Sequence, residues 1–225
     1  MAIVGIVWAL VLPPWQAPDE NSHFAYVQSV AESLKLPKST GGTLLSSDQN
    51  LGATLSGSGF FAYPMSAAVN WFASDWNTYR TEDRQQRPSR TDGGGDNPAA
   101  SNPPLYYLVA SIPYLIVHST NVFGRLYAVR LFGVLMPIAT TIGAWLLAGE
   151  VLGRRRLLQL VSAATVGLWP MLTFLATSVN PDSLVNAAST FVLWLGARVI
   201  NRRAQTRDAV ALCAVTAVAI LAKYT

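Results

Sequence analysis

The sequence predicts an all-α, polytopic membrane protein, and three observations lead to this fold class. Of its 225 residues, 51% are hydrophobic and only 12% are charged, whereas an ordinary soluble domain carries about 25% charged residues. Apolar runs of the length needed to cross a bilayer, about 20 residues, fill the second half of the chain. Basic residues gather between these runs. A single cysteine also excludes a disulfide-stapled secreted domain.

The charge is divided unevenly along the chain. Residues 15–103 contain six Lys or Arg and nine Asp or Glu, whereas residues 104–225 contain ten Lys or Arg and three Asp or Glu. The basic residues of the second part form two clusters, at 154–156 and 198–207. Short cytoplasmic loops are enriched in Lys and Arg, so we expect both clusters on the cytoplasmic side and the acidic segment outside. Because this charge follows topology rather than one exposed face, we expect no nucleic-acid partner.

The apolar runs predict where the chain crosses the membrane. Residues 1–14 predict a first transmembrane helix whose start is missing, because about 12 apolar residues rise only about 18 Å; a cleaved signal peptide is the alternative. Residues 15–125 then form an extracytoplasmic loop, and residues 126–225 form four transmembrane helices. These helices are expected at about 126–149, 157–176, 183–200 and 208–225.

Two amphipathic helices are expected in the extracytoplasmic loop. The first covers about 18–34, where apolar residues recur at helical spacing. The second covers 104–118. If this run crossed the membrane, the acidic segment and the 154–156 cluster would share one side, against the positive-inside rule. We therefore expect it to lie in the outer interface, with Tyr106, Tyr107 and Tyr114 at headgroup level. The Gly-rich stretch 91–102 is expected to be flexible.

The strongest candidate for chemistry is the segment 13–24, which directly follows the first apolar run. It places Asp19, Glu20 and His23 at the outer membrane surface. Asp19 and His23 are four residues apart and would share a helix face. That arrangement suits a general base with a hydrogen-bond partner, or half of a metal site. The alternative is that Asp19 and Glu20 are only favourable residues for the first turn of a helix.

Two further candidates lie in the hydrophobic half. Asn180 and Asp182 belong to the outer turn between two spans, and an acid at a membrane boundary is a functional candidate. The alternative for Asp182 is an N-cap, since a helix is expected to follow it. Arg130 lies near the outer end of a span, where it could meet a phosphate or a carboxylate. The alternative for Arg130 is snorkelling to the headgroups.

Taken in order, these motifs resemble a known group of enzymes. The outward Asp19-Glu20 pair is followed by a long loop, the segment Asn102 to Tyr107, Arg130-Leu131 at the start of a span, and the turn Asn180 to Asp182. This order resembles the GT-C superfamily of polytopic glycosyltransferases. Within it, the chain looks most like the amino-terminal part of a bacterial family of predicted membrane proteins of unknown function, which shares an Asp-Glu-x-x-His-Phe motif.

The resemblance implies a fold, a reaction and a location. The fold would be GT-C-like, in the bacterial cytoplasmic membrane, with the large loop outside and membrane lipid around the spans. The enzyme would move a sugar from a polyprenyl-phosphate donor to a glycan or lipid acceptor. Asp19 matches the acid that activates the acceptor, with Glu20 and His23 beside it. Asp182 matches a second acid, which assists the site or binds metal in some members. We expect Asp182 to bind substrate together with Asn180 of the same turn and with Arg130, which is placed by its position and charge. A divalent metal ion held by Asp19 and Asp182 is also implied.

Two other functions remain as alternatives. A transporter or flippase for a lipid-linked glycan would need ionisable residues near the middle of several spans, and the spans expected here are nearly free of them. A non-catalytic membrane protein would tolerate the loss of the Asp19 carboxylate.

Overall fold

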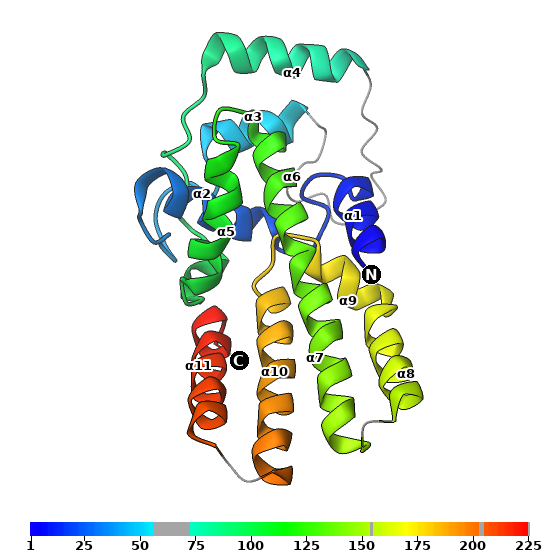
Figure 1. The fold of residues 1–225 in the computed structure, drawn as a ribbon. Coiled ribbons are helices and arrows are strands. Elements are labelled where there is room, and N and C mark those ends of the chain that lie inside the picture. Colours follow the sequence, from blue (N-terminus) through cyan, green and yellow to red (C-terminus); the bar gives the residue numbers. More distant parts are fainter. Residues whose placement is uncertain (56–72, 154, 203–204, 225) are drawn as a thin grey trace. The chain divides into compact units, whose positions relative to one another are not determined.

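The computed structural model of the chain describes residues 1–55, 73–153, 155–202 and 205–224. Within these ranges all regular structure is helical and no strand is present, which confirms the predicted all-α class. The chain divides into two compact units (Figure 1). The loop unit comprises Leu10–Ser101 and Tyr107–Val129, and the bundle unit comprises Met1–Ala9, Asn102–Tyr106 and Arg130–Thr225. Aromatic residues between 60 and 72, which the sequence places in the outer loop, lie outside the described residues.

The bundle unit is built around helix α10 (Asp182–Asn201), which packs against α7 (Leu135–Val151) on one side and α11 (Thr206–Ala222) on the other. Helix α8 (Arg156–Gly167) packs on α7, and α9 (Pro170–Ala176) follows after a bend of 57°. A proline at the first position of α9 explains this break, because the ring removes a backbone donor. Figure 1 shows these helices running up and down beside one another.

Two helical stretches are long and apolar enough to cross a membrane, among the residues described. They are Val122–Val151, which joins α6 (Val122–Gly133) to α7, and α10; the bent pair α8–α9 makes a third if it counts as one span. They cover the spans expected at 126–149, 183–200 and 157–176. Helix α11 has 17 residues, and the span expected at 208–225 stays a prediction. Helix α1 (Ala2–Val11) is apolar but short.

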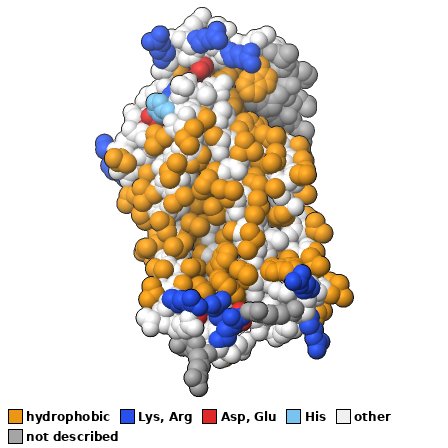
Figure 2. Space-filling view, in the orientation of Figure 1, with side chains coloured by type: hydrophobic (Ala, Val, Ile, Leu, Met, Phe, Trp, Pro, Cys, Tyr) orange, Lys and Arg blue, Asp and Glu red, His pale blue; other side chains and the backbone are white. Residues whose placement is uncertain are grey.

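The ends of the bundle unit differ in charge. The turns after α7 and α10 lie at the same end of the unit, and the turn before α10 lies at the opposite end (Figure 1). Lys and Arg side chains gather at the first of these ends, below a broad apolar surface (Figure 2). This is the arrangement that the positive-inside rule favours when such an end faces the cytoplasm.

The loop unit contains α2 (Glu20–Ser33), α3 (Ser47–Leu55), α4 (Ala73–Gln86), the short 3-10 helix η1 (Pro98–Ser101) and most of α5 (Leu105–Ile116). Its core is largely aromatic. Tyr26 stacks on Tyr107 with ring centroids 3.6 Å apart, and Tyr79 and Phe123 pack edge to face at 4.9 Å. Each such buried ring contributes about 1.5–3 kcal/mol.

The tyrosines of α5 differ from the expectation. Tyr106, Tyr107 and Tyr114 are buried within the protein, so their rings are not exposed for contact with lipid headgroups. The exposed side of α5 is aliphatic and contains Leu108, Ile112, Leu115 and Ile116. The tyrosines were misplaced because their hydroxyls find hydrogen-bond partners inside the chain, which makes their burial favourable.

The stretch 91–102 also differs from the expectation of flexibility. Gly94 and Gly95 donate backbone hydrogen bonds to Leu44 and Thr43, at 2.9 and 2.8 Å. A Cβ at Gly93 would lie 2.3 Å from the backbone nitrogen of Ser46, so only glycine fits there. The glycines of this stretch therefore serve close backbone packing, which composition alone does not distinguish from flexibility.

Candidate functional site

Asp19 lies directly before α2, in the loop unit. Its backbone is left-handed, with φ 56° and ψ 8°, and its side chain is exposed. Within the part of the chain that the structure describes, the Asp19 carboxylate makes no hydrogen bond or ion pair. Asp19 is thus an accessible carboxylate, free to accept a proton or a hydrogen bond from a bound molecule.

Glu20 holds this turn from the inside. Its side chain is fully buried, and its Oε2 accepts a hydrogen bond from the backbone N–H of Trp15 at 3.0 Å. Trp15 itself has a left-handed backbone with φ 58°. A left-handed conformation costs a non-glycine residue about 1–2 kcal/mol, so two such residues within five positions mark a strained turn. Strain of this kind is concentrated at functional sites.

His23 does not pair with Asp19, although the spacing of four residues predicts a shared face. Its Nδ1 lies 2.9 Å from the hydroxyl of Tyr107 on α5, and its side chain is buried. Asp19 is the N-cap of α2, and its carbonyl oxygen accepts a backbone hydrogen bond from the N–H of His23 at 3.0 Å. Its left-handed φ and ψ lie outside the helical range, so its side chain does not project along the face that the spacing rule assumes. The His23 side chain therefore positions α2 against α5 and is not the hydrogen-bond partner of the Asp19 carboxylate.

Asn180 and Asp182 lie at the start of α10, in the bundle unit. The Asn180 Oδ1 accepts a hydrogen bond from the backbone N–H of Asp182 at 2.9 Å, which caps the helix. Asp182 does not serve as the N-cap. Its Oδ1 instead accepts a hydrogen bond from the Lys223 ammonium at 2.6 Å, and the two charged groups form an ion pair. Lys223, which the sequence did not single out, thus places a cation beside the acid of the turn.

Arg130 also belongs to the bundle unit. Its side chain is fully buried, and its Nη1 donates to the carbonyl oxygen of Ala9 at 3.4 Å. A buried guanidinium does not reach the headgroups, so snorkelling is wrong for this residue. The six candidates therefore divide between the units: Asp19, Glu20 and His23 in the loop unit, and Arg130, Asn180 and Asp182 in the bundle unit.

The candidate acids do not fit a divalent metal ion. Among the residues described, no three His, Cys, Asp or Glu side chains form a group able to hold one. The Glu20 carboxylate is turned to the backbone of Trp15, and the Asp182 carboxylate is neutralised by Lys223. A hard cation needs several free oxygen ligands, so no metal-dependent step is assigned to these residues.

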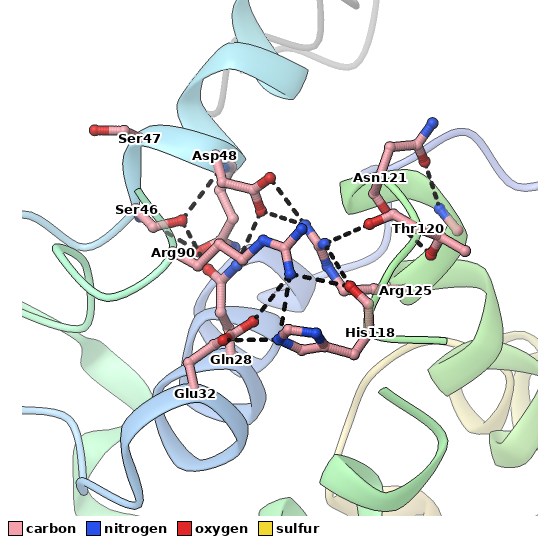
Figure 3. A network of polar contacts seen from close by, with 12 residues as sticks. Gln28, Glu32, Ser46, Ser47, Asp48, Arg90, His118, Thr120, Asn121 and Arg125 are labelled. Carbon is pink, nitrogen blue, oxygen red and sulfur yellow. Dashed lines mark hydrogen bonds and ion pairs between the residues drawn. The ribbon is translucent and has the colours of Figure 1, made fainter. Parts of the chain in front are cut away.

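A second polar centre in the loop unit was missed by sequence reasoning (Figure 3). Its core is an ion pair in which Arg125 Nη2 lies 2.6 and 2.8 Å from the two carboxylate oxygens of Asp48. Both side chains are buried, and Gln28 also donates to Asp48 at 2.9 Å. Burial raises the pKa of the Asp48 carboxyl, and the Arg125 guanidinium acts against this rise. Removing one partner of such a pair costs about 3–5 kcal/mol.

Glu32 links this ion pair to the surface. It accepts hydrogen bonds from the Tyr114 hydroxyl at 2.7 Å and from His118 Nε2 at 3.1 Å, and it lies 3.6 Å from Arg90 Nη1. Burial opposes ionisation of Glu32, but its hydrogen bonds with Tyr114 and His118, together with the nearby charges of His118 and Arg90, lower its pKa. Burial raises the pKa of the Tyr114 hydroxyl, which stays a donor.

A pocket of about 410 Å³ opens beside this network. Its charged lining consists of Glu32, Asp48, Asp83, Arg87, Arg90 and His118. The imidazole and carboxylate could relay a proton, and the arginines could bind an anion or a hydroxyl. Glu32 lies near the far end of α2 from Asp19, and a 14-residue helix is about 20 Å long. The pocket is therefore separate from the Asp19 turn.

The signal for this network was only partly present in the sequence. His118 is one of two histidines, and Arg125 directly precedes the long apolar run that contains Arg130. Their partners, however, are 86 and 77 residues away along the chain. No local spacing rule connects residues so far apart.

Comparison with known proteins gives the family of the chain. A family model described as a predicted membrane protein, DUF2142, matches residues 2–225. The chain belongs to the DUF2142 family. This agrees with the family of predicted membrane proteins that the motifs resemble, and the match covers both units. Neither the curated proteins nor the solved structures give a significant match to the chain.

Proposed function

We propose that this DUF2142 protein is a GT-C-type glycosyltransferase that moves a sugar from a polyprenyl-phosphate donor to a glycan or lipid acceptor outside the cytoplasmic membrane. The observation that carries the proposal is the Asp19 carboxylate, which is exposed, unpaired within the described residues and held by a strained turn. A catalytic base needs an accessible carboxylate in a fixed position. Glu20 fixes that position from within the protein.

In the proposed reaction, Asp19 takes the proton of the acceptor hydroxyl while the acceptor oxygen attacks the anomeric carbon. The bond from that carbon to the phosphate oxygen breaks, and polyprenyl phosphate leaves with the bonding electrons. The glycosylated acceptor is left with a neutral oxygen, and polyprenyl phosphate carries the negative charge. The proton stays on Asp19 until solvent removes it. The chemistry needs the base on the face opposite the leaving group.

For the donor, we propose that the bundle unit contributes the charged turn before α10. Lys223, whose ammonium pairs with Asp182, lines a pocket of about 230 Å³ that is otherwise lined mostly by apolar side chains of α10 and α11. We propose that a phosphate attached to a hydrocarbon chain would share the Lys223 ammonium with Asp182 and place its chain along the apolar lining. Asn180 keeps this turn in place through its cap, and buried Arg130 adds positive charge to the interior of the unit.

Transport has less support. The two candidate spans contain no charged residue between 131 and 149 or between 183 and 197. Translocation of a charged lipid-linked glycan would need such residues along the path.

The test is Asp19→Asn, made in cells that lack the chromosomal gene, with envelope glycans followed by mass spectrometry. We expect the glycan absent from the deletion strain to return with the native protein and to fall about 100-fold or more with Asp19→Asn, the contribution typical of a general base. Glu82→Gln, on the surface of α4, removes a carboxylate elsewhere in the loop unit and should restore the glycan fully. Full restoration by Asp19→Asn at normal membrane abundance would favour a non-catalytic protein.

A further inference from the structure

Another pocket lies at the basic end of the bundle unit. Its volume is about 650 Å³, and it is formed where the last turns of α7 and α10 meet the first turn of α8. The lining residues that matter here are Trp145, Glu150, Arg156, Trp194, Arg198 and Arg202. The pocket thus combines three guanidinium groups with one carboxylate and two tryptophans.

Two of the arginines are already paired, and the third is not. Arg202 binds Glu150 through Nε and Nη2, at 3.0 and 2.5 Å, and Arg198 Nε lies 3.2 Å from Asp208 Oδ1. Arg156 has no hydrogen bond or ion pair with any residue that the structure describes, and its side chain is exposed. One positive charge of the pocket therefore remains available to a ligand.

The position of Arg156 is unfavourable for the protein alone. It is the first residue of α8, where the helix dipole is positive and a cation is repelled. Arg155 precedes it at the N-cap and makes no side-chain cap, so the first N–H groups of α8 lack the partner that a capping side chain provides. An anion would relieve both conditions, because it pairs with the guanidinium and accepts hydrogen bonds from the helix start.

The surroundings of the pocket indicate where this anion comes from. Leu157, Leu160 and Val161, on the first turns of α8, are 72%, 56% and 54% exposed. Trp194, over which Arg198 lies at 5.8 Å, and Trp145 are the residue type that concentrates at the membrane interface. A ligand in this pocket would therefore meet charge at its head and apolar side chains along its tail.

We propose that this pocket binds the phosphate headgroup of an anionic phospholipid. The phosphate lies between the Arg156 guanidinium and the first backbone N–H groups of α8, and the acyl chains follow the exposed Leu157, Leu160 and Val161 of that helix. Basic pockets between transmembrane helices are a recognised binding mode for such headgroups. The site is distinct from the Asp19 turn, belongs entirely to the bundle unit and does not depend on the proposed glycosyltransferase activity.

The test compares lipids and matched variants of the purified full-length protein by native mass spectrometry. Phosphatidylglycerol is titrated against phosphatidylcholine, and glycerol phosphate is the soluble probe. We expect a preference for phosphatidylglycerol that falls about fivefold in Arg156→Gln, the factor that corresponds to about 1 kcal/mol per arginine at an anionic surface. Arg155→Gln removes the same charge one residue away, outside the pocket lining, and should leave the preference nearly unchanged.

Three results would overturn the proposal. Equal binding of the two lipids would exclude selectivity for an anionic headgroup. An equal loss in Arg155→Gln and Arg156→Gln would assign the preference to the overall charge of this end. Binding of glycerol phosphate as tight as that of phosphatidylglycerol would identify a site for soluble anions. Because Arg156 is exposed, its variant should fold, and an unchanged elution volume on size exclusion checks this.

Discussion

The Glu32 carboxylate connects several elements of the loop unit. Its carboxylate joins α2 to Tyr114 of α5 and to His118 just beyond that helix, while Arg90 approaches from the segment after α4. Gln28, one turn earlier on α2, donates to both Tyr114 and Asp48 and so connects Glu32 to the buried ion pair. Hydrogen bonds that involve a charged partner contribute more than neutral ones, so this residue governs several tertiary contacts at once.

This arrangement predicts an acid-dependent loss of stability that Glu32→Gln removes. The pKa of Glu32 in the folded protein is lower than its ordinary value of 4.5. The stabilisation is therefore complete above pH 4.5 and is lost as the pH falls through the lower pKa of the folded state. We expect Glu32→Gln to lower the melting temperature at neutral pH and to approach the native protein in acid. Tryptophan fluorescence during heating, repeated across this pH range, measures both curves.

The control for this prediction is Glu82→Gln. Glu82 lies on the surface of α4, where its contact is with Gln86 four residues along the same helix. Its variant should follow the native pH curve. If Glu32→Gln and the native protein lost stability in parallel as the pH falls, the lowered pKa of Glu32 would have no role in folding.

Among the helices of the bundle unit, small residues set how closely two elements approach. A Cβ at Gly133, the last residue of α6, would lie 2.7 Å from the carbonyl oxygen of Ala176 at the end of α9. The obstacle is backbone, which cannot rotate away as a side chain can. Small residues at such contacts are characteristic of helix packing in membranes.

Gly133→Ala should therefore destabilise the bundle unit by about 1–3 kcal/mol, the usual cost of overpacking. The matched control is Gly196→Ala on α10, where a Cβ meets nothing within 4 Å. That change should be neutral or stabilising by about 0.5–1 kcal/mol, because alanine loses less backbone entropy in a helix than glycine. Thermal unfolding of both variants in one detergent compares them. Equal melting temperatures would show that α6 and α9 can separate without cost.

The helices themselves follow from sequence more readily than their contacts. Helix α2 lies within the stretch 18–34 that apolar periodicity indicates, and α10 lies where the apolar run between two polar turns predicts a span. Helix α2 begins at Glu20, later than the expected start at about 18, because Asp19 adopts a left-handed conformation that periodicity does not encode. The tyrosines of α5 were misplaced because their partners, such as Glu32, lie far away in the chain.

For the whole molecule, composition and charge order carry most of what could be predicted. The all-α membrane class follows from scarce charge and long apolar runs, whereas the family was indicated by the resemblance of the ordered motifs; the helical class is confirmed among the described residues and the family by the match over residues 2–225. The turns after α7 and α10 lie at one end of the bundle unit, as the positions of the basic clusters require. The Asp48–Arg125 pair could not be predicted, because it joins residues 77 positions apart that are each ordinary in their local sequence.

Membrane topology is the prediction that depends on the whole chain. In a Cys213→Ser background, Lys35→Cys and Ser119→Cys should react with a membrane-impermeant maleimide in intact cells, since both exposed positions belong to the segment expected outside. Gln205→Cys, in the basic turn before α11, should react only after permeabilisation. Ser119 follows α5, so the comparison with Lys35 decides whether that helix crosses. Labelling of Lys35→Cys without Ser119→Cys would show that α5 spans the membrane and would place the 154–156 cluster on the outer side.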